Sequence, residues 1–365
     1  TAYRRQRQMC IRDRYNIWML MCFLALSSCY EEETIIPTHS GNTGRFEFPQ
    51  GNNSWDNEIV EIYEKFGVRL IYKDIIDKDF TKSWTGGDGG LYATFYGTGC
   101  INDEMVQFYV RFMQEHVFQY INPQITEKVF PMYWYLTYDF YSVLSFMPVP
   151  TAQLNHSAAT FLDAWLTCFW GTEHTDPKYG GISDPVSAWK SPVSGNKDSY
   201  TKRRYDILSC ILTGAIDRGN IVIPEEFDTG FDHGTRLVTG DTEKDKANPN
   251  HYLNRGYPGV INSTSLDYAK PSSLAPNAKT TFLNYMGLSL RLTSAEREAL
   301  FPSADYPFIK GKFDYIQRYM KEQYNIDLEK IANGPENWEI TPYPAFASPT
   351  PVSYTHLTLP TICSV

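Results

Sequence analysis

The sequence predicts an α+β fold with long surface loops for most of its 365 residues. Amphipathic helical patterns begin near Ser54, Asn102 and Ser199, and aromatic, β-branched runs between them indicate strands. The strand patterns do not alternate regularly with helices, which argues against a doubly wound fold. Aromatic residues make up 15% of the chain, enough to fill a sizeable core. We therefore expect one α+β domain over residues 55–351.

The two ends of the chain contain pentapeptides that one DNA element can encode. Residues 9–13, MCIRD, can be written ATG TGT ATA AGA GAC, and the reverse complement of that string encodes VSYTH, the sequence of residues 352–356. The element resembles a transposon end used in sequencing-library adapters. We therefore interpret residues 1–14 and 352–365 as cloning or assembly sequence and exclude them from the fold.

This exclusion makes the remaining chain more acidic. Residues 1–14 carry five Arg and one Asp, so the rest has 28 Lys and Arg against 41 Asp and Glu, a net charge of −13 instead of −9. A nucleic-acid partner is not expected, because a phosphate-binding surface needs a basic excess.

A short apolar run follows the excluded N-terminal residues. Residues 17–26 are uncharged but fewer than the roughly 20 apolar residues that span a bilayer, which suits a signal peptide over residues 15–28. The run ends in LSSC (26–29), which resembles the lipobox of bacterial lipoproteins, so Cys29 is the expected lipidation site. An ordinary signal peptide with an unrelated Cys is the alternative.

The residues after Cys29 bear on where such a lipoprotein would lie. The sequence YEEE (30–33) resembles a surface-export signal of Gram-negative lipoproteins, and a solvated acidic linker is the alternative. Residues 29–54 are rich in Thr, Gly, Asn and Pro and indicate a tether. We expect a lipid-anchored outer-membrane protein exposed on the cell surface.

A helix and a strand open the folded part. Ile59, Ile62 and Phe66 fall at helical spacing, and Gly67 suits the left-handed stop position. Residues 68–72 then alternate as a strand.

A capped helix and an aromatic strand follow. Asn102 or Asp103 can cap a helix whose inward face carries Met105, Phe108, Phe112 and Met113. Residues 128–144 indicate a strand, whereas residues 158–171 fit either a strand or a buried helix.

The second half is mainly helical, apart from long loops at 175–199 and 228–278. The expected elements are a helix over 199–220 with Ile207, Cys210, Ile211 and Ala215 inward, a buried helix over 280–290, a short helix with Thr293 and Glu296 as capping box, and a closing amphipathic helix from Pro307 to Ile331.

Ordered stretches between about Trp55 and Ile331 resemble one family. They are IYEKFGVRLIYKD (62–74), the central helix followed by IPEEF (223–227), and FLNYMGLSLRLTSAEREAL (282–300) followed by YNIDL (324–328). Together they resemble the substrate import-associated zinc metallohydrolase lipoproteins, which are gluzincin-like metallopeptidases. The resemblance implies a gluzincin-like domain, and it implies a TonB-dependent importer and its binding lipoprotein as partners.

The catalytic motif of that family is altered in this chain. The family's central helix carries HExxH, whose two His bind Zn²⁺ from one helical face while the Glu acts as general base. Here the helix has Asp206 at the first His position, Ile207 at the Glu position and Cys210 at the second His position. Asn284 stands at the third-ligand position. The resemblance therefore implies a degenerate site, and we expect no zinc cofactor.

Two interpretations of the altered helix remain open. Carboxylate and thiolate groups can bind zinc, so Asp206 and Cys210 could serve an active metallohydrolase with an atypical site. The structural interpretation makes Cys210 a small buried apolar residue and pairs Asp206 with Arg203 or Arg204.

Aromatic residues in the loops are the other candidate functional residues, because Tyr and Trp rings suit stacking on sugars or peptides. They are Trp170, Tyr179, Trp189, Tyr252 and Tyr257. Core packing is the alternative, and it is the preferred interpretation for Trp134 and Trp165, which lie inside regular elements.

These observations favour a non-catalytic binding or scaffold subunit of an outer-membrane nutrient-import system, with an oligosaccharide or peptide as ligand. An active peptidase and a purely structural interaction lipoprotein are the alternatives.

Overall fold

The computed structural model of the chain describes residues 44–80, 93–144, 151–154, 160–161, 164–169, 197–263 and 265–336. The helices are α2 (Ser54–Phe66), α3 (Asp103–His116), α4 (Pro123–Thr126), α5 (Lys197–Arg218), α6 (Glu225–Asp228), α7 (Glu243–Lys246), α8 (Ala278–Arg291), α9 (Ser294–Leu300), α10 (Pro307–Tyr324) and α11 (Leu328–Asn333), with short 3-10 helices η1 (Asp77–Phe80) and η2 (Phe118–Tyr120). The strands are β1 (Arg69–Ile71), β2 (Ala93–Gly99), β3 (Tyr133–Leu144), β4 (Thr151–Leu154), β5 (Thr160–Phe161), β6 (Ala164–Cys168), β7 (Val260–Ile261) and β8 (Tyr268–Ala269).

The long strand β3 organises a mixed sheet. Its first half pairs in parallel with β1 on one side and β6 on the other, and its second half pairs antiparallel with β2 and β4. The predicted α+β class is confirmed. Helix α3 lies in sequence between the parallel strands β1 and β3, but β2 lies there as well, so strands and helices do not alternate regularly in this part of the chain. Alternation of apolar and polar residues along a strand shows which of its faces is buried, but it does not show which strand pairs with it.

The first half of β3 is buried on both faces, as parallel strands usually are. Trp134 and Leu136 belong to the main core, whereas Tyr133 and Tyr135 belong to a smaller core on the opposite face. Trp134 contacts Trp165 of β6 edge to face, with ring centroids 5.1 Å apart. Both Trp residues therefore pack in the core, as predicted, and residues 164–168 form a strand.

Helix ends follow the predicted caps. The Asn102 side chain accepts a hydrogen bond of 2.8 Å from the Met105 amide at the start of α3. Thr293 and Glu296 form the predicted capping box of α9. Gly67 ends α2 with a φ of 74°, a backbone region that disfavours residues with a Cβ.

The closing segment differs from its prediction. One helix was expected from Pro307 to Ile331, but Asn325 adopts a φ of 54° and ends α10. Asp327 then caps the separate helix α11. Asn tolerates the left-handed region better than most residues, which accounts for the break. The predicted loop 228–278 likewise contains α7 and the β7–β8 hairpin.

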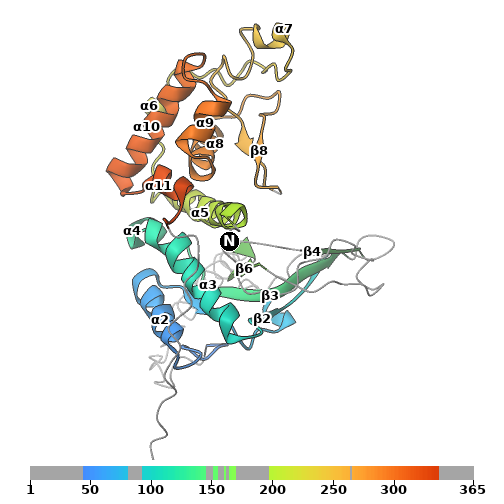
Figure 1. Cartoon of the computed structure of the whole chain (residues 1–365), viewed down its shortest axis with the longest axis vertical. Coiled ribbons are helices and arrows are strands. Elements are labelled where there is room, and N and C mark those ends of the chain that lie inside the picture. The colour runs from blue at the N-terminus through green and yellow to red at the C-terminus, as the bar shows by residue number, and fades with distance from the viewer. Residues whose placement is uncertain are drawn as a thin grey trace, which may run out of the picture. The chain divides into compact units, whose positions relative to one another are not determined.

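Helix α5 lies between the strands and the group α8–α11 (Figure 1). Arg204 of α5 holds it in this position through hydrogen bonds to neighbouring elements. The Arg204 side chain is fully buried. It donates hydrogen bonds to Ile331 O at 2.7 Å and Ala332 O at 3.2 Å, and to His116 Nδ1 at 3.0 Å. Its guanidinium group thereby joins α3, α5 and α11.

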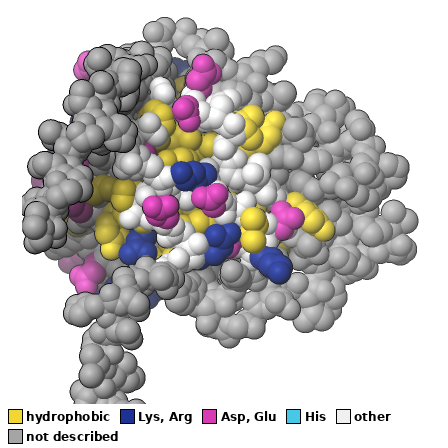
Figure 2. Space-filling view, turned by 90° about the horizontal axis from the view of Figure 1, so that it is seen from below, with side chains coloured by type: hydrophobic (Ala, Val, Ile, Leu, Met, Phe, Trp, Pro, Cys, Tyr) yellow, Lys and Arg dark blue, Asp and Glu magenta, His cyan; other side chains and the backbone are white. Residues whose placement is uncertain are grey.

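The surface gives no sign of a single-signed patch on the face that Figure 2 presents. Among the described side chains there, Lys and Arg lie interspersed with Asp and Glu. Over the ranges given above, no helix combines the length and apolar character needed to span a bilayer.

We expect His116 to make the fold acid-sensitive. Burial, and then the charge of Arg204, lower the pKa of His116 from 6.5 to about 3. The His116 ring therefore binds a proton more readily in the unfolded chain than in the folded one. The stability that comes from its neutral form is complete above pH 6.5 and is lost as pH falls toward 3. His116 should therefore lower the free energy of unfolding by about 2 kcal/mol when the pH falls from 7 to 5.

Urea unfolding at both pH values measures this loss. His116→Gln keeps an acceptor for Arg204 but cannot gain a proton, so its loss should be smaller by about the same amount. An equal loss in the two proteins would show that His116 does not carry the effect.

Candidate functional site

The two helices on which the family resemblance places the altered zinc positions, α5 and α8, pack directly against each other. Gly287 of α8 faces Tyr205 of α5, and a Cβ added at Gly287 would lie 3.4 Å from the Tyr205 hydroxyl oxygen. Asp206 and Cys210 occupy positions i and i+4 of α5, on one face of the helix.

Asp206 is engaged with its own helix. Its carboxylate Oδ2 lies 3.9 Å from Nη1 of Arg203, which is an ion pair too long for a hydrogen bond. Burial raises the pKa of Asp206, and the charge of Arg203 partly opposes that rise. The sequence suggested Arg203 or Arg204 as the partner of Asp206. The structure pairs Asp206 with Arg203, whereas Arg204 hydrogen-bonds to α3 and α11.

The neighbouring positions belong to the core. Ile207 is fully buried in the main core and offers no group that could accept a proton. Cys210 is half-buried and packs against the same core. The Cys210 observation agrees with the structural interpretation, in which its thiol acts as a small apolar group.

The residue that the resemblance places at the third-ligand position, Asn284, is not a usual zinc ligand. Asn284 is half-buried on α8, and its amide is neutral, whereas zinc in proteins is held by Cys, His, Asp or Glu. Among the residues that the structure describes, no group of three or more His, Cys, Asp or Glu side chains is placed to hold a metal ion.

The aromatic candidates divide into two groups. Tyr252 and Tyr257 are buried, with exposed fractions of 4% and 1%, in a small cluster with Leu237. The Tyr257 hydroxyl donates to Asp232 O at 2.9 Å. This burial argues against stacking of a ligand on either ring and agrees with core packing. Trp170, Tyr179, Trp189 and the lipidation candidate Cys29 lie outside the described residues.

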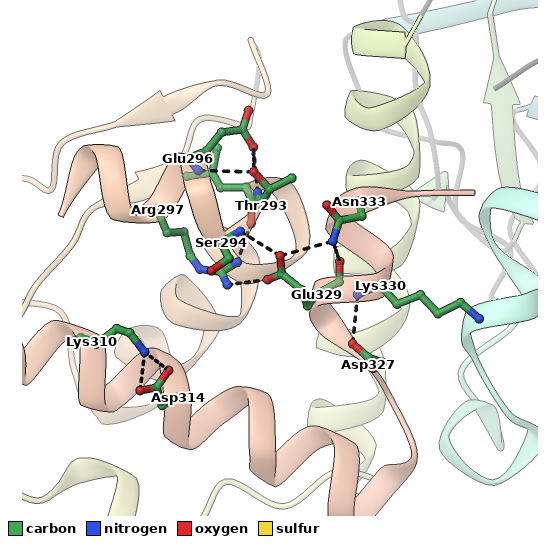
Figure 3. A network of polar contacts seen from close by, with 11 residues as sticks. Thr293, Ser294, Glu296, Arg297, Lys310, Asp314, Asp327, Glu329, Lys330 and Asn333 are labelled. Carbon is green, nitrogen blue, oxygen red and sulfur yellow. Dashed lines mark hydrogen bonds and ion pairs between the residues drawn. The ribbon is translucent and has the colours of Figure 1, made fainter. Parts of the chain in front are cut away.

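A second site, which the sequence did not predict, lies among α9, α10 and α11. The cavity has a volume of about 780 Å³ and a mostly charged lining. Glu329 of α11 accepts hydrogen bonds from the Ser294 amide at 2.9 Å and from Arg297 Nη2 at 2.6 Å, and Asn333 lies beside it (Figure 3). These contacts hold α11 against α9 at one side of the cavity.

The signal for this cavity in the sequence is weak. Asp314, Gln317, Arg318 and Lys321 follow the i, i+3, i+4, i+7 spacing of one helical face. Such a polar stripe is also typical of any solvated face, and only the arrangement of α9 and α11 turns it into a cavity wall.

Comparison with known proteins gives a distant likeness. No family model matches the chain, and no curated protein matches it. Among solved structures, the chain is similar to a protein from Bacteroides caccae proposed to be a zinc-binding metallo-peptidase. The two are 12% identical with a TM-score of 0.39, over 80% of this chain and 93% of the other. A likeness of this size extends to no residue role.

We expect Asp206→Asn to be nearly neutral for stability. The raised pKa means that the ionised carboxylate is disfavoured in the folded chain, so removing its charge should cost no more than about 1 kcal/mol at pH 7. Urea unfolding, with Ile207→Ala as a control expected to cost about 2–5 kcal/mol, measures the difference. A loss above that of the control would indicate that Asp206 has an essential partner other than Arg203.

Proposed function

We propose that the chain is a surface lipoprotein with a degenerate metallopeptidase-like domain that binds or scaffolds and does not hydrolyse. It would serve an outer-membrane nutrient-import system alongside a TonB-dependent importer and its binding lipoprotein. The support is the family resemblance of the sequence together with the state of the altered helix.

One observation carries the non-catalytic part of the proposal. A zinc peptidase of this type needs a carboxylate between its two helical ligands to take a proton from the metal-bound water. That position holds Ile207, which is fully buried in the main core and cannot take a proton. The adjacent Asp206 is paired with Arg203.

Anchoring rests on the sequence alone. The apolar run 17–26 before Cys29 and the acidic YEEE after it support export and lipidation. The tether that follows would let the domain stand away from the membrane.

A binding role for the domain fits its charge. The chain without its excluded ends is acidic, which suits a peptide or oligosaccharide ligand better than a nucleic acid.

Metal content tests the non-catalytic part. The full chain, incubated with micromolar zinc and then dialysed, should hold far less than one zinc per chain by atomic emission, and Cys210→Ser should hold the same amount. About one zinc per chain, lost in Cys210→Ser, would overturn the proposal in favour of an atypical metallohydrolase using Asp206 and Cys210.

Lipid labelling tests the anchor. Expressed in a Gram-negative host with an alkyne-tagged fatty acid, the chain should take up label and partition to the outer membrane, and Cys29→Ser should do neither. Because one cysteine carries the anchor, the loss should be complete. An unlabelled wild-type chain in the membrane fraction would remove lipidation from the proposal.

A further inference from the structure

We propose that the cavity among α9, α10 and α11 binds the carboxylate group of a ligand. This inference rests on the proposed function as a binding subunit and gives that subunit a site and a ligand class. The cavity has a volume of about 780 Å³, which lies within the range of small-ligand pockets, roughly 300–1,000 Å³.

The charges of the cavity favour an anion. Each of its three carboxylates already has a cationic partner. Arg297 Nη2 lies 2.6 Å from Glu329, and Lys321 Nζ lies 2.7 Å from Asp327. Asp314 is paired with Lys310, one turn earlier on α10 (Figure 3).

Two cations remain in surplus. The side chains of Arg318 and Lys330 line the cavity, and neither forms an ion pair with a described residue. The Lys330 side chain points away from Glu329 (Figure 3), which places it at the margin. Arg318 is the more central group, because it lies on the same helical face as Asp314 and Lys321. Its guanidinium carbon lies 5.8 Å from the Tyr315 ring centroid.

Gln317 supplies a second observation. Its Nε2 atom is screened from solvent and has no hydrogen-bond partner among the described residues. A buried donor without an acceptor costs about 1–3 kcal/mol, so such an atom calls for an explanation. Gln317 lines the cavity and its terminal amide torsion is soft, so Nε2 can rotate to meet an acceptor bound there.

The geometry of these groups points to a carboxylate. A guanidinium group presents two parallel N–H donors that match the two oxygens of a carboxylate, and the neighbouring amide can donate to the same group. The paired carboxylates of Asp327 and Glu329, at the start of α11, retain lone pairs for hydroxyl or amide donors on the rest of the ligand. Two sources offer that combination, a uronic acid oligosaccharide and the free C-terminus of a short peptide.

Isothermal titration calorimetry of the full chain tests the site with matched probes. The saccharide pair is trigalacturonic acid and neutral galactotriose, and the peptide pair is triglycine and triglycinamide. We expect one of the two carboxylate probes to bind and its neutral counterpart to bind at least tenfold more weakly. Arg318→Ala should weaken the bound probe about tenfold or more, and Arg318→Lys should restore only part of the loss.

Matched variants keep the result interpretable. Arg218→Ala removes an equally exposed cation at the end of α5, outside the cavity, and should leave binding unchanged. Failure of both carboxylate probes to bind, or equal binding by wild type and Arg318→Ala, would overturn the site. Neutral probes that bind independently of Arg318 would also overturn it, while the proposed binding function would stand. The zinc-content experiment described above tests the non-catalytic part of the proposed function separately.

Discussion

The buried guanidinium of Arg204 is the contact on which the arrangement of the helices depends. It lies in the core and satisfies two carbonyl oxygens of α11 and one ring nitrogen of α3. A charged group in such a place is tolerated only when its hydrogen bonds are made, so α11 and α3 can occupy few other positions relative to α5. The cost of burial appears in its pKa, which desolvation lowers to about 10.

That constraint positions both candidate sites. Helix α5 carries Asp206 and Cys210, and the α11 residues held by Arg204 lie two and three residues after Glu329, which contacts Ser294 and Arg297 beside the charged cavity. On α5, Ile207 lies in the main core and Asp206 forms an ion pair with Arg203. The charged cavity has kept cations beyond those that its own carboxylates neutralise. The proposed recognition surface therefore lies on α10 and not on α5.

Local signals predicted elements better than their assembly. The cap at Asn102, the stop at Gly67 and the capping box at Thr293 each depend on neighbours within a few residues, so the sequence contains the cause. The parallel pairing of β1 with β3 depends on residues far apart in the sequence. The break at Asn325 uses the tolerance of Asn for the left-handed region, and the end of α10 is held in addition by a 2.9 Å hydrogen bond from the distant Asn122 to Tyr324 O. The cavity needs three helices at once, and the burial of Tyr252 and Tyr257 needs a folded loop. Neither could be predicted from spacing.

The acceptors of Arg204 also set an order of events during synthesis. Ile331 lies 127 residues after Arg204, and Tyr324 lies 202 residues after Asn122. The centre of the domain therefore cannot close until residue 332 has been made, however early the sheet and α3 emerge. Contacts of such long separation slow folding, because the intervening chain must be ordered first. A nascent chain of this kind therefore stays open until late in its synthesis, because the last residues that close the centre are among the last to be made.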